Sequence, residues 1–150
     1  MIGSISDILK IKTVDELRAV GNDFPEEVRR VLATLQDQLR KNILSTDITD
    51  ISLHMGLVES WRDRVATYLS FAAGLVDWSQ SDRFLLTRAE GEPKLAASER
   101  DGFQKELRAP FTALQVSLEQ TIRSIDSRVN LCKRHLGLAD DGKHAWRQSN

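Results

Sequence analysis

The chain has 150 residues, of which 41% are hydrophobic and 29% are charged, and its formal net charge is −1. These values suit one globular domain and exclude general disorder, and the near-neutral charge excludes a global attraction to nucleic acid or membrane. The single cysteine, Cys132, excludes an internal disulfide and suits a reducing compartment. The N-terminus lacks the pattern of a secretory signal, and the longest apolar stretch is too short for a bilayer span. We therefore expect a soluble, cytoplasmic protein.

The first 44 residues are expected to form a helical extension. Thr13 and Glu16 have the spacing of a capping box, which predicts a short helix that ends at Gly21. Pro25, followed by two glutamates, predicts a second helix start, because the first turn of a helix does not need the N–H that proline lacks. Apolar residues then recur at steps of three and four, which extends this second helix to about Leu44.

Residues 45–138 are expected to form the core, a helical hairpin with coiled-coil-like packing. Its first arm is one long helix from the capping residue Asp47 to about Ala89, bent near Gly74 or at Ser79–Ser81. This arm is apolar on two faces, with Arg62 as one charged interruption, so both faces need burial in the chain's own bundle or against another subunit. The residues expected at an oligomer or partner interface are Ile51, Val58, Trp61, Tyr68, Phe71 and Trp78, together with Trp146 near the C-terminus.

The second arm follows a predicted break at residues 90–93. Its apolar residues alternate in threes and fours as far as Leu136, and Gly137 is its predicted end. Pro110 lies inside this run, where it removes a backbone hydrogen bond, so we expect a kink or a restart there. Residues 139–150 show no periodicity and are expected to be a mobile tail. No strand pattern occurs, so the predicted fold is all-α: a long-helix bundle with short N-terminal helices.

Residues suited to catalysis or metal binding have simpler explanations. Asp47, Asp50 and His54 share a helix face, as metal ligands do, but acids at a helix start usually cap free N–H groups, which is the favoured interpretation. Cys132 lies on an apolar stripe, where a thiol is a small buried hydrophobe. The sequence has neither a glycine-rich phosphate loop nor a serine-centred elbow. We therefore expect no enzyme activity, no cofactor and no metal.

The last 30 residues are the basic part of the chain. They contain six Lys and Arg against three Asp, whereas the other 120 residues carry a net charge of −4. On a helical projection, Arg123 and Arg134 lie opposite the apolar stripe, and Arg128 and Lys133 flank it. Two interpretations stay open: a face that binds phosphates, or a solvated face whose cations complement the helix dipole. Trp146 is expected to stack on a base, to dock on a neighbouring subunit or to pack loosely.

Residues 124–133 (SIDSRVNLCK), with 97–101 (ASERD) upstream, resemble the small phage recombination mediators, which load a recombinase onto single-stranded DNA. The resemblance extends over about residues 45–140. It implies an all-helical subunit, a ring-shaped homo-oligomer, single-strand binding, and contacts with a recombinase and a single-strand-binding protein. Arg128 and Lys133 match basic positions of the family's closing helix, and Arg83 and Arg88 fall in the basic stretch before the turn. The N-terminal extension, a missing aromatic pair and a less basic middle helix depart from the family.

The favoured function is therefore that of a non-enzymatic, single-stranded DNA-binding recombination mediator. The residues predicted to bind nucleic acid are Arg83, Arg88, Lys94, Arg123, Arg128, Lys133 and Arg134. The main alternative is a phage structural or assembly protein (a virion, scaffolding or adaptor component) that acts only through helix–helix contacts. A regulator whose helical face captures one partner helix is a third possibility. No membrane is expected as a partner.

Overall fold

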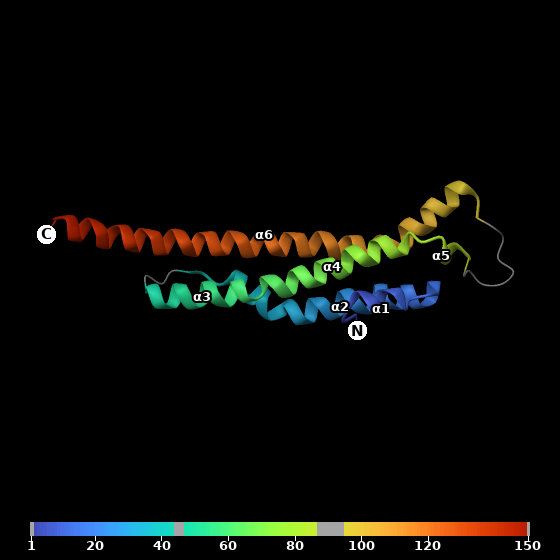
Figure 1. Cartoon of the computed structure of the whole chain (residues 1–150), viewed down its shortest axis with the longest axis horizontal. Coiled ribbons are helices and arrows are strands. Elements are labelled where there is room, and N and C mark those ends of the chain that lie inside the picture. Colours follow the sequence, from blue (N-terminus) through green and yellow to red (C-terminus); the bar gives the residue numbers. More distant parts are fainter. Residues whose placement is uncertain (1, 44–46, 87–94, 150) are drawn as a thin grey trace. The chain divides into compact units, whose positions relative to one another are not determined.

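The computed structural model describes residues 2–43, 47–86 and 95–149, of which Leu86 and residues 138–149 are described by backbone alone. Within these ranges every regular element is a helix, which confirms the all-α prediction (Figure 1). The helices are α1 (Ile5–Leu9), α2 (Val14–Arg40), α3 (Ile48–Ser60), α4 (Arg62–Ser79), α5 (Arg83–Leu86) and α6 (Ala97–Ser149). No helix in the described ranges combines the length and the hydropathy that crossing a bilayer would need.

The helices form two compact units. Unit 1 comprises Met1–Val31 and Thr67–Glu119, and unit 2 comprises Leu32–Ala66 and Gln120–Asn150. The long helices α2, α4 and α6 each contribute residues to both units. Each unit buries its own apolar stripes, as amphipathic helices require.

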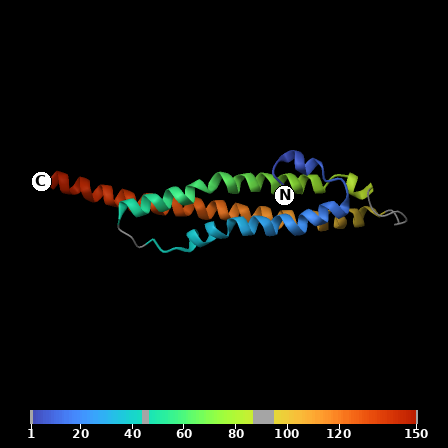
Figure 2. The same cartoon turned by 90° about the horizontal axis from the view of Figure 1, so that it is seen from below.

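Unit 1 is built from α1, α5 and parts of the three long helices. α1 lies alongside α4 (Figure 2), where a Cβ on Gly74 would be 3.1 Å from Cδ1 of Ile8. Gly74 therefore makes room for α1 and does not end the helix. The indole Nε1 of Trp78 donates a hydrogen bond of 2.8 Å to the carbonyl of Ile11. The buried core contains Ile8, Leu17, Phe24, Val28, Tyr68, Phe71, Leu75, Phe84, Leu107, Phe111, Leu114 and Leu118.

α2 is a single helix, so the predicted end at Gly21 and restart at Pro25 are wrong. Pro25 lacks the N–H that would bond to the carbonyl of Gly21, but the buried side chains of Phe24 and Val28 hold the helix together through this defect. Gly21 itself is small because α6 crosses there: a Cβ would lie 3.3 Å from Cγ of Pro110. Packing between helices has therefore overridden two local stop-and-start signals.

The predicted capping box at the start of α2 is present with one change. The N–H of Glu16 donates to the hydroxyl of Thr13 at 3.2 Å, as the spacing predicts. The carboxylate of Glu16 accepts a bond of 3.0 Å from the N–H of Lys12, one residue before the cap. Both groups thus satisfy backbone N–H groups at the helix start.

The arm predicted as one helix from Asp47 to Ala89 is divided into α3, α4 and α5. The predicted cap is confirmed, because Asp47 accepts a bond of 2.9 Å from the N–H of Thr49. α4 ends at Ser79, one of the two places where a bend was predicted, whereas the division at Trp61 was not predicted. The break predicted at residues 90–93 lies outside the described residues.

α6 runs without a restart through Pro110, and Figure 1 shows its yellow first part at an angle to the orange part that follows. This matches the kink that an internal proline produces. The predicted end at Gly137 is wrong, since the backbone is helical as far as Ser149. The mobility of residues 139–150 stays a prediction.

Unit 2 packs the end of α2, α3, the first turn of α4 and α6 from Gln120 onward. Arg62, the charged interruption of the apolar stripe, forms an exposed fork with Asp126: Nε to Oδ1 is 2.9 Å and Nη2 to Oδ2 is 3.4 Å. This hydrogen bonding lowers the pKa of Asp126 and raises the pKa of Arg62. The buried core contains Leu32, Leu35, Ile51, Val58, Val65, Ile125, Val129 and Cys132.

Candidate anion-binding groove

An open groove of about 500 Å³ lies in unit 2 between the end of α2 and α6. Its residues on α6 follow helical spacing, so they share one face of that helix. Polar and basic side chains make up most of the lining, and none of the lining residues is acidic. The lining residues are Gln36, Leu39 and Arg40 from α2, and Arg123, Ser124, Ser127, Arg128 and Leu131 from α6.

Arg128 forms a fixed part of the groove wall. Its Nη1 donates a hydrogen bond of 2.7 Å to the carbonyl of Lys41, and its Nη2 donates to the carbonyl of Leu39. These carbonyls belong to the C-terminal end of α2, where backbone acceptors lack intrahelical partners and the helix dipole favours a cation. Arg128 is therefore a cap of α2 as well as a source of charge.

Arg40 and Arg123 supply exposed charge on the two sides of the groove. Neither forms an ion pair with an acid in the described part of the chain. Ser124 and Ser127 add exposed hydroxyl groups to the α6 side. Guanidinium and hydroxyl groups are the donors that proteins use for phosphate oxygens, so this arrangement suits a phosphate or carboxylate ligand.

Sequence reasoning missed Arg40. Its sequence signal is a cation in the last turn of a helix, which complements the dipole in many helices and does not by itself indicate a ligand. The structure adds the second half of the site, because it places Arg40 across a groove from Arg123.

His54 lies inside unit 2. Its Nε2 atom is buried without a hydrogen-bond partner among the described residues. Burial lowers the pKa of His54, and the charges of Arg128 and Lys41 lower that pKa further, so the ring is neutral near pH 7. Among the described residues there is no group of three or more side chains suited to hold a metal ion.

Cys132 is buried in the core of unit 2, as predicted. Burial raises the pKa of its thiol, although Arg128 opposes this shift. A buried thiol with a raised pKa is a poor nucleophile.

The other predicted nucleic-acid residues lie outside the groove. Lys133 and Arg134 are exposed on α6 beyond its last lining residue. By helical geometry, Arg134 continues the Arg123 side about three turns further along, whereas Lys133 points about 80° to the other side. Arg83 belongs to unit 1, where its guanidinium lies 5.6 Å from the ring centre of Trp78. Arg88 and Lys94 are outside the described residues.

Most residues predicted for an oligomer interface are used within the chain. Ile51 and Val58 are buried in unit 2, and Tyr68 and Phe71 are buried in unit 1, so the chain's own helices cover these four side chains. Tyr68 packs edge-on against Phe24, with ring centres 6.4 Å apart.

The tryptophans predicted for the same interface differ from one another. Trp78 is half-buried and hydrogen-bonded to Ile11. Trp61 is half-buried, with Arg64 over its ring at 5.3 Å. The side chain of Trp146 is outside the described ones.

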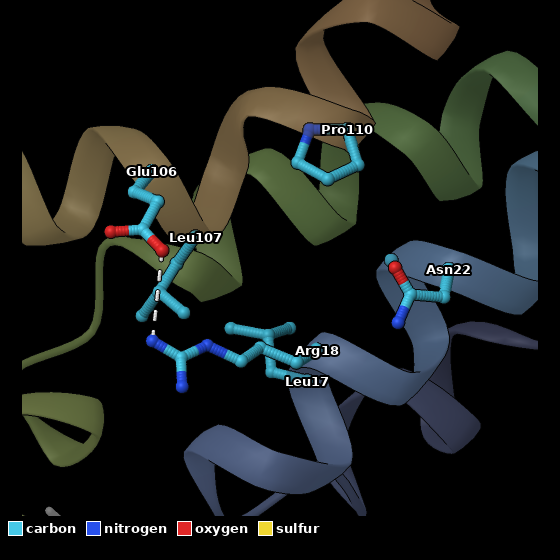
Figure 3. A pocket seen from close by; sticks show the side chains of 7 residues that line it. Leu17, Arg18, Asn22, Glu106, Leu107 and Pro110 are labelled. Carbon is cyan, nitrogen blue, oxygen red and sulfur yellow. Dashed lines mark ion pairs between the residues drawn. The ribbon is translucent and has the colours of Figure 1, made fainter.

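A second, smaller hollow of about 230 Å³ lies in unit 1 between α2 and α6 (Figure 3). Arg18 reaches from α2 towards Glu106 on α6, and the two side chains form an exposed ion pair of 3.7 Å. Leu17, Leu107 and Pro110 supply its apolar lining. This volume is below the roughly 300–1,000 Å³ of most ligand sites, so the groove in unit 2 is the better candidate.

The charge of the two units also favours the groove. Unit 2 has ten Lys and Arg against eight Asp and Glu, whereas unit 1 has eleven against fourteen. The groove therefore lies in the more basic unit.

Protein families, curated proteins and solved structures were each compared with the chain, and none of them matches it.

Proposed function

We propose that this protein is a non-enzymatic recombination mediator that binds the backbone of single-stranded DNA in the groove of unit 2. The observation that supports this proposal is the lining itself, in which three arginines and two serines face a ligand space without an acidic residue. Such a lining attracts phosphates and offers charge-assisted hydrogen bonds to their oxygens.

The proposed binding is independent of base sequence. None of the lining residues is aromatic, so the groove offers no platform on which a base can stack. Arginine and serine contacts to phosphates position a strand without identifying its bases. If two or three phosphates are neutralised, the affinity falls about tenfold between 50 and 200 mM salt, because each phosphate contributes about −0.7 to the logarithmic salt dependence of single strands.

The resemblance to phage recombination mediators supplies the biological part of the proposal. It implies single-stranded DNA as the ligand, and a recombinase and a single-strand-binding protein as partners in the host cytoplasm. Residues 124–133, which carry that resemblance, include four of the groove's lining residues on α6.

The test is a fluorescence anisotropy titration of a labelled oligothymidylate of about 20 nucleotides. Arg40→Glu and Arg123→Glu each change the charge of the groove by −2 and should weaken binding at least about tenfold at 50 mM salt. Lys133→Glu is the matched control, since it makes the same charge change on α6 away from the groove; it should weaken binding by less than about threefold. Equal losses in all three variants would reveal attraction by net charge alone, and absence of binding by the unmodified protein would end the proposal.

A phage structural or assembly component remains a second candidate. It is favoured by the exposed apolar side chains on α3, where Leu53 is 68% and Leu57 is 45% exposed. For such a component, Arg40→Glu and Arg123→Glu would leave its function intact, whereas Leu53→Glu would remove its partner contact.

A further inference from the structure

α3 carries an exposed apolar stripe on the side that the core of unit 2 does not use. Leu53 is 68% exposed, Leu57 is 45% exposed, and Trp61 follows four residues later, half-buried. Ile51 and Val58 on the same helix are buried, so the packing of unit 2 is already satisfied by another face.

The helical path continues through the junction of α3 and α4. Trp61 has helical torsion angles (φ −81°, ψ −17°), and its N–H donates to the carbonyl of Val58 at 3.2 Å. The N–H of Val65 in turn donates to the carbonyl of Trp61 at 3.0 Å. Residues on both sides of the junction therefore keep one helical register, and Arg64 in the first turn of α4 falls on the same stripe as Leu57.

The stripe has the same spacing from either end. Its five residues, Asp50, Leu53, Leu57, Trp61 and Arg64, follow one another at steps of three, four, four and three, with Leu57 at the centre. An acid stands at one end and a base at the other. A second copy laid antiparallel would place Asp50 opposite Arg64 twice, Leu53 opposite Trp61 twice, and Leu57 opposite Leu57. A parallel copy would place like charges together.

Gly56 borders this stripe, and no contact among the described residues requires a glycine there. A Cβ at Gly56 would meet nothing within 4 Å. Glycine weakens a helix, so its presence in an exposed helix interior needs another explanation. Together with Ser60, one turn later and also exposed, it leaves one flank of the stripe low enough for a partner helix to approach closely.

We infer that two copies of this chain associate through antiparallel pairing of the stripe Asp50–Arg64. The palindromic spacing, the opposite charges at its ends and the small flanking residues all fit a second copy. The contact covers about four helical turns. The area that it buries is smaller than the roughly 800 Å² per partner of a standard interface, so association is weak, and half of the chains are dimeric at about 100 μM. This inference does not rest on DNA binding.

Sedimentation velocity without nucleic acid, from 10 μM to 1 mM protein at low salt, tests the pairing. Asp50→Lys and Arg64→Glu each bring like charges together twice, so each variant alone should self-associate at least about tenfold more weakly than the unmodified chain. An equimolar mixture of the two variants restores two opposite-charge pairs and should form a heterodimer as readily as the unmodified chain dimerises. A monomeric unmodified chain at 1 mM, or a mixture that stays monomeric, would overturn the inference.

Two further variants distinguish this contact from non-specific hydrophobic association. Leu53→Glu places a charge on an exposed side chain of the stripe and should leave the protein monomeric. This variant keeps Asp50, so it still tests the pairing if Asp50→Lys destabilises the start of α3. Leu9→Glu on α1 is the matched control, because Leu9 is 52% exposed and receives the same change. Equal loss of dimer in both variants would contradict the stripe. Helix content by circular dichroism confirms that each variant is folded.

Discussion

At the scale of single residues, Arg128 joins α6 to the C-terminal end of α2 through hydrogen bonds to two backbone carbonyls. The sequence places a basic residue on the flank of an apolar helix, and both a phosphate-binding and a solvated role agree with that position. Its actual acceptors are carbonyls at the end of α2, one of them 87 residues earlier in the chain. No local pattern predicts a partner so distant, because backbone carbonyls are present at every position.

Replacing Arg128 should lower stability through the loss of this cap. Arg128→Met keeps much of the aliphatic stem but leaves two carbonyls of α2 without their charged donor, so we expect the free energy of unfolding to fall by about 1–2 kcal/mol. Urea denaturation measures this loss. Arg134→Met, at an exposed position on the same helix, is the control and should change the free energy of unfolding by less than about 0.5 kcal/mol.

The pKa of His54 should rise in Arg128→Met, because the charge of Arg128 lowers it. An unchanged His54 pKa by NMR titration would argue against the proximity of the two groups.

His54 should make the protein less stable in mild acid. Its folded-state pKa lies below the ordinary value of 6.5, so below about pH 6.5 the unfolded chain binds a proton that the folded chain does not. The contribution of the neutral His54 ring to the free energy of unfolding is therefore fully present above about pH 6.5. It is lost as the pH falls through 6.5 towards the lower folded-state pKa. Urea denaturation at pH 7.5 and at pH 5.5 measures the free energy of unfolding at each pH. The difference between the two values should be smaller for His54→Gln than for the unmodified chain. An identical difference would assign the acid sensitivity to other groups.

At the scale of helices, periodicity located nearly every apolar face correctly, whereas boundary residues were less informative. Thr13 and Asp47 act as caps because capping is local, and a sequence shows local chemistry directly. Gly21 and Pro25 have the appearance of a helix end and a helix start, yet both lie inside α2. Their roles depend on contacts with residues from other helices, such as Pro110, which the sequence around them does not contain.

The two glycines inside helices give a direct test of this distinction. Gly56→Ala removes the helix penalty of glycine, and its Cβ meets none of the described atoms within 4 Å, so the free energy of unfolding of the monomer should rise by about 0.5–1 kcal/mol. Gly21→Ala gains the same term but presses a Cβ to 3.3 Å from Pro110 and 3.6 Å from Phe111, two stiff rings. That overpacking should outweigh the gain and destabilise by about 1 kcal/mol. Denaturation at micromolar concentration compares the pair, and equal stabilisation of both would show that the crossing at Gly21 is loose.

At the scale of the whole molecule, composition and periodicity predicted the all-α fold, and the apolar pattern predicted that the long arm needs burial on two faces. They left open whether a second subunit covers one face. The structure shows Ile51 and Tyr68 buried in the cores of different units, whereas Leu53 and Leu57 on α3 stay exposed. The groove could be predicted only on its α6 side. Its other side, with Arg40, comes from a helix remote in sequence that only tertiary packing brings near.

The distribution of charge between the units predicts where a polyanion should leave its footprint. Unit 1 has more acids than bases, whereas unit 2 has the reverse balance and the groove of Arg40, Arg123 and Arg128. Binding of an oligothymidylate should therefore slow hydrogen–deuterium exchange in peptides covering residues 36–43 and 120–134, and leave exchange in residues 1–31 unchanged.

Slower exchange is expected chiefly at the end of α2, where the last turn opens most readily and a bound phosphate holds the charge of Arg40 in place. The same experiment at high salt is the control, because competing ions remove the electrostatic part of the binding and should erase the footprint. Protection confined to residues 1–31, or protection that persists at high salt, would contradict a backbone-binding groove in unit 2.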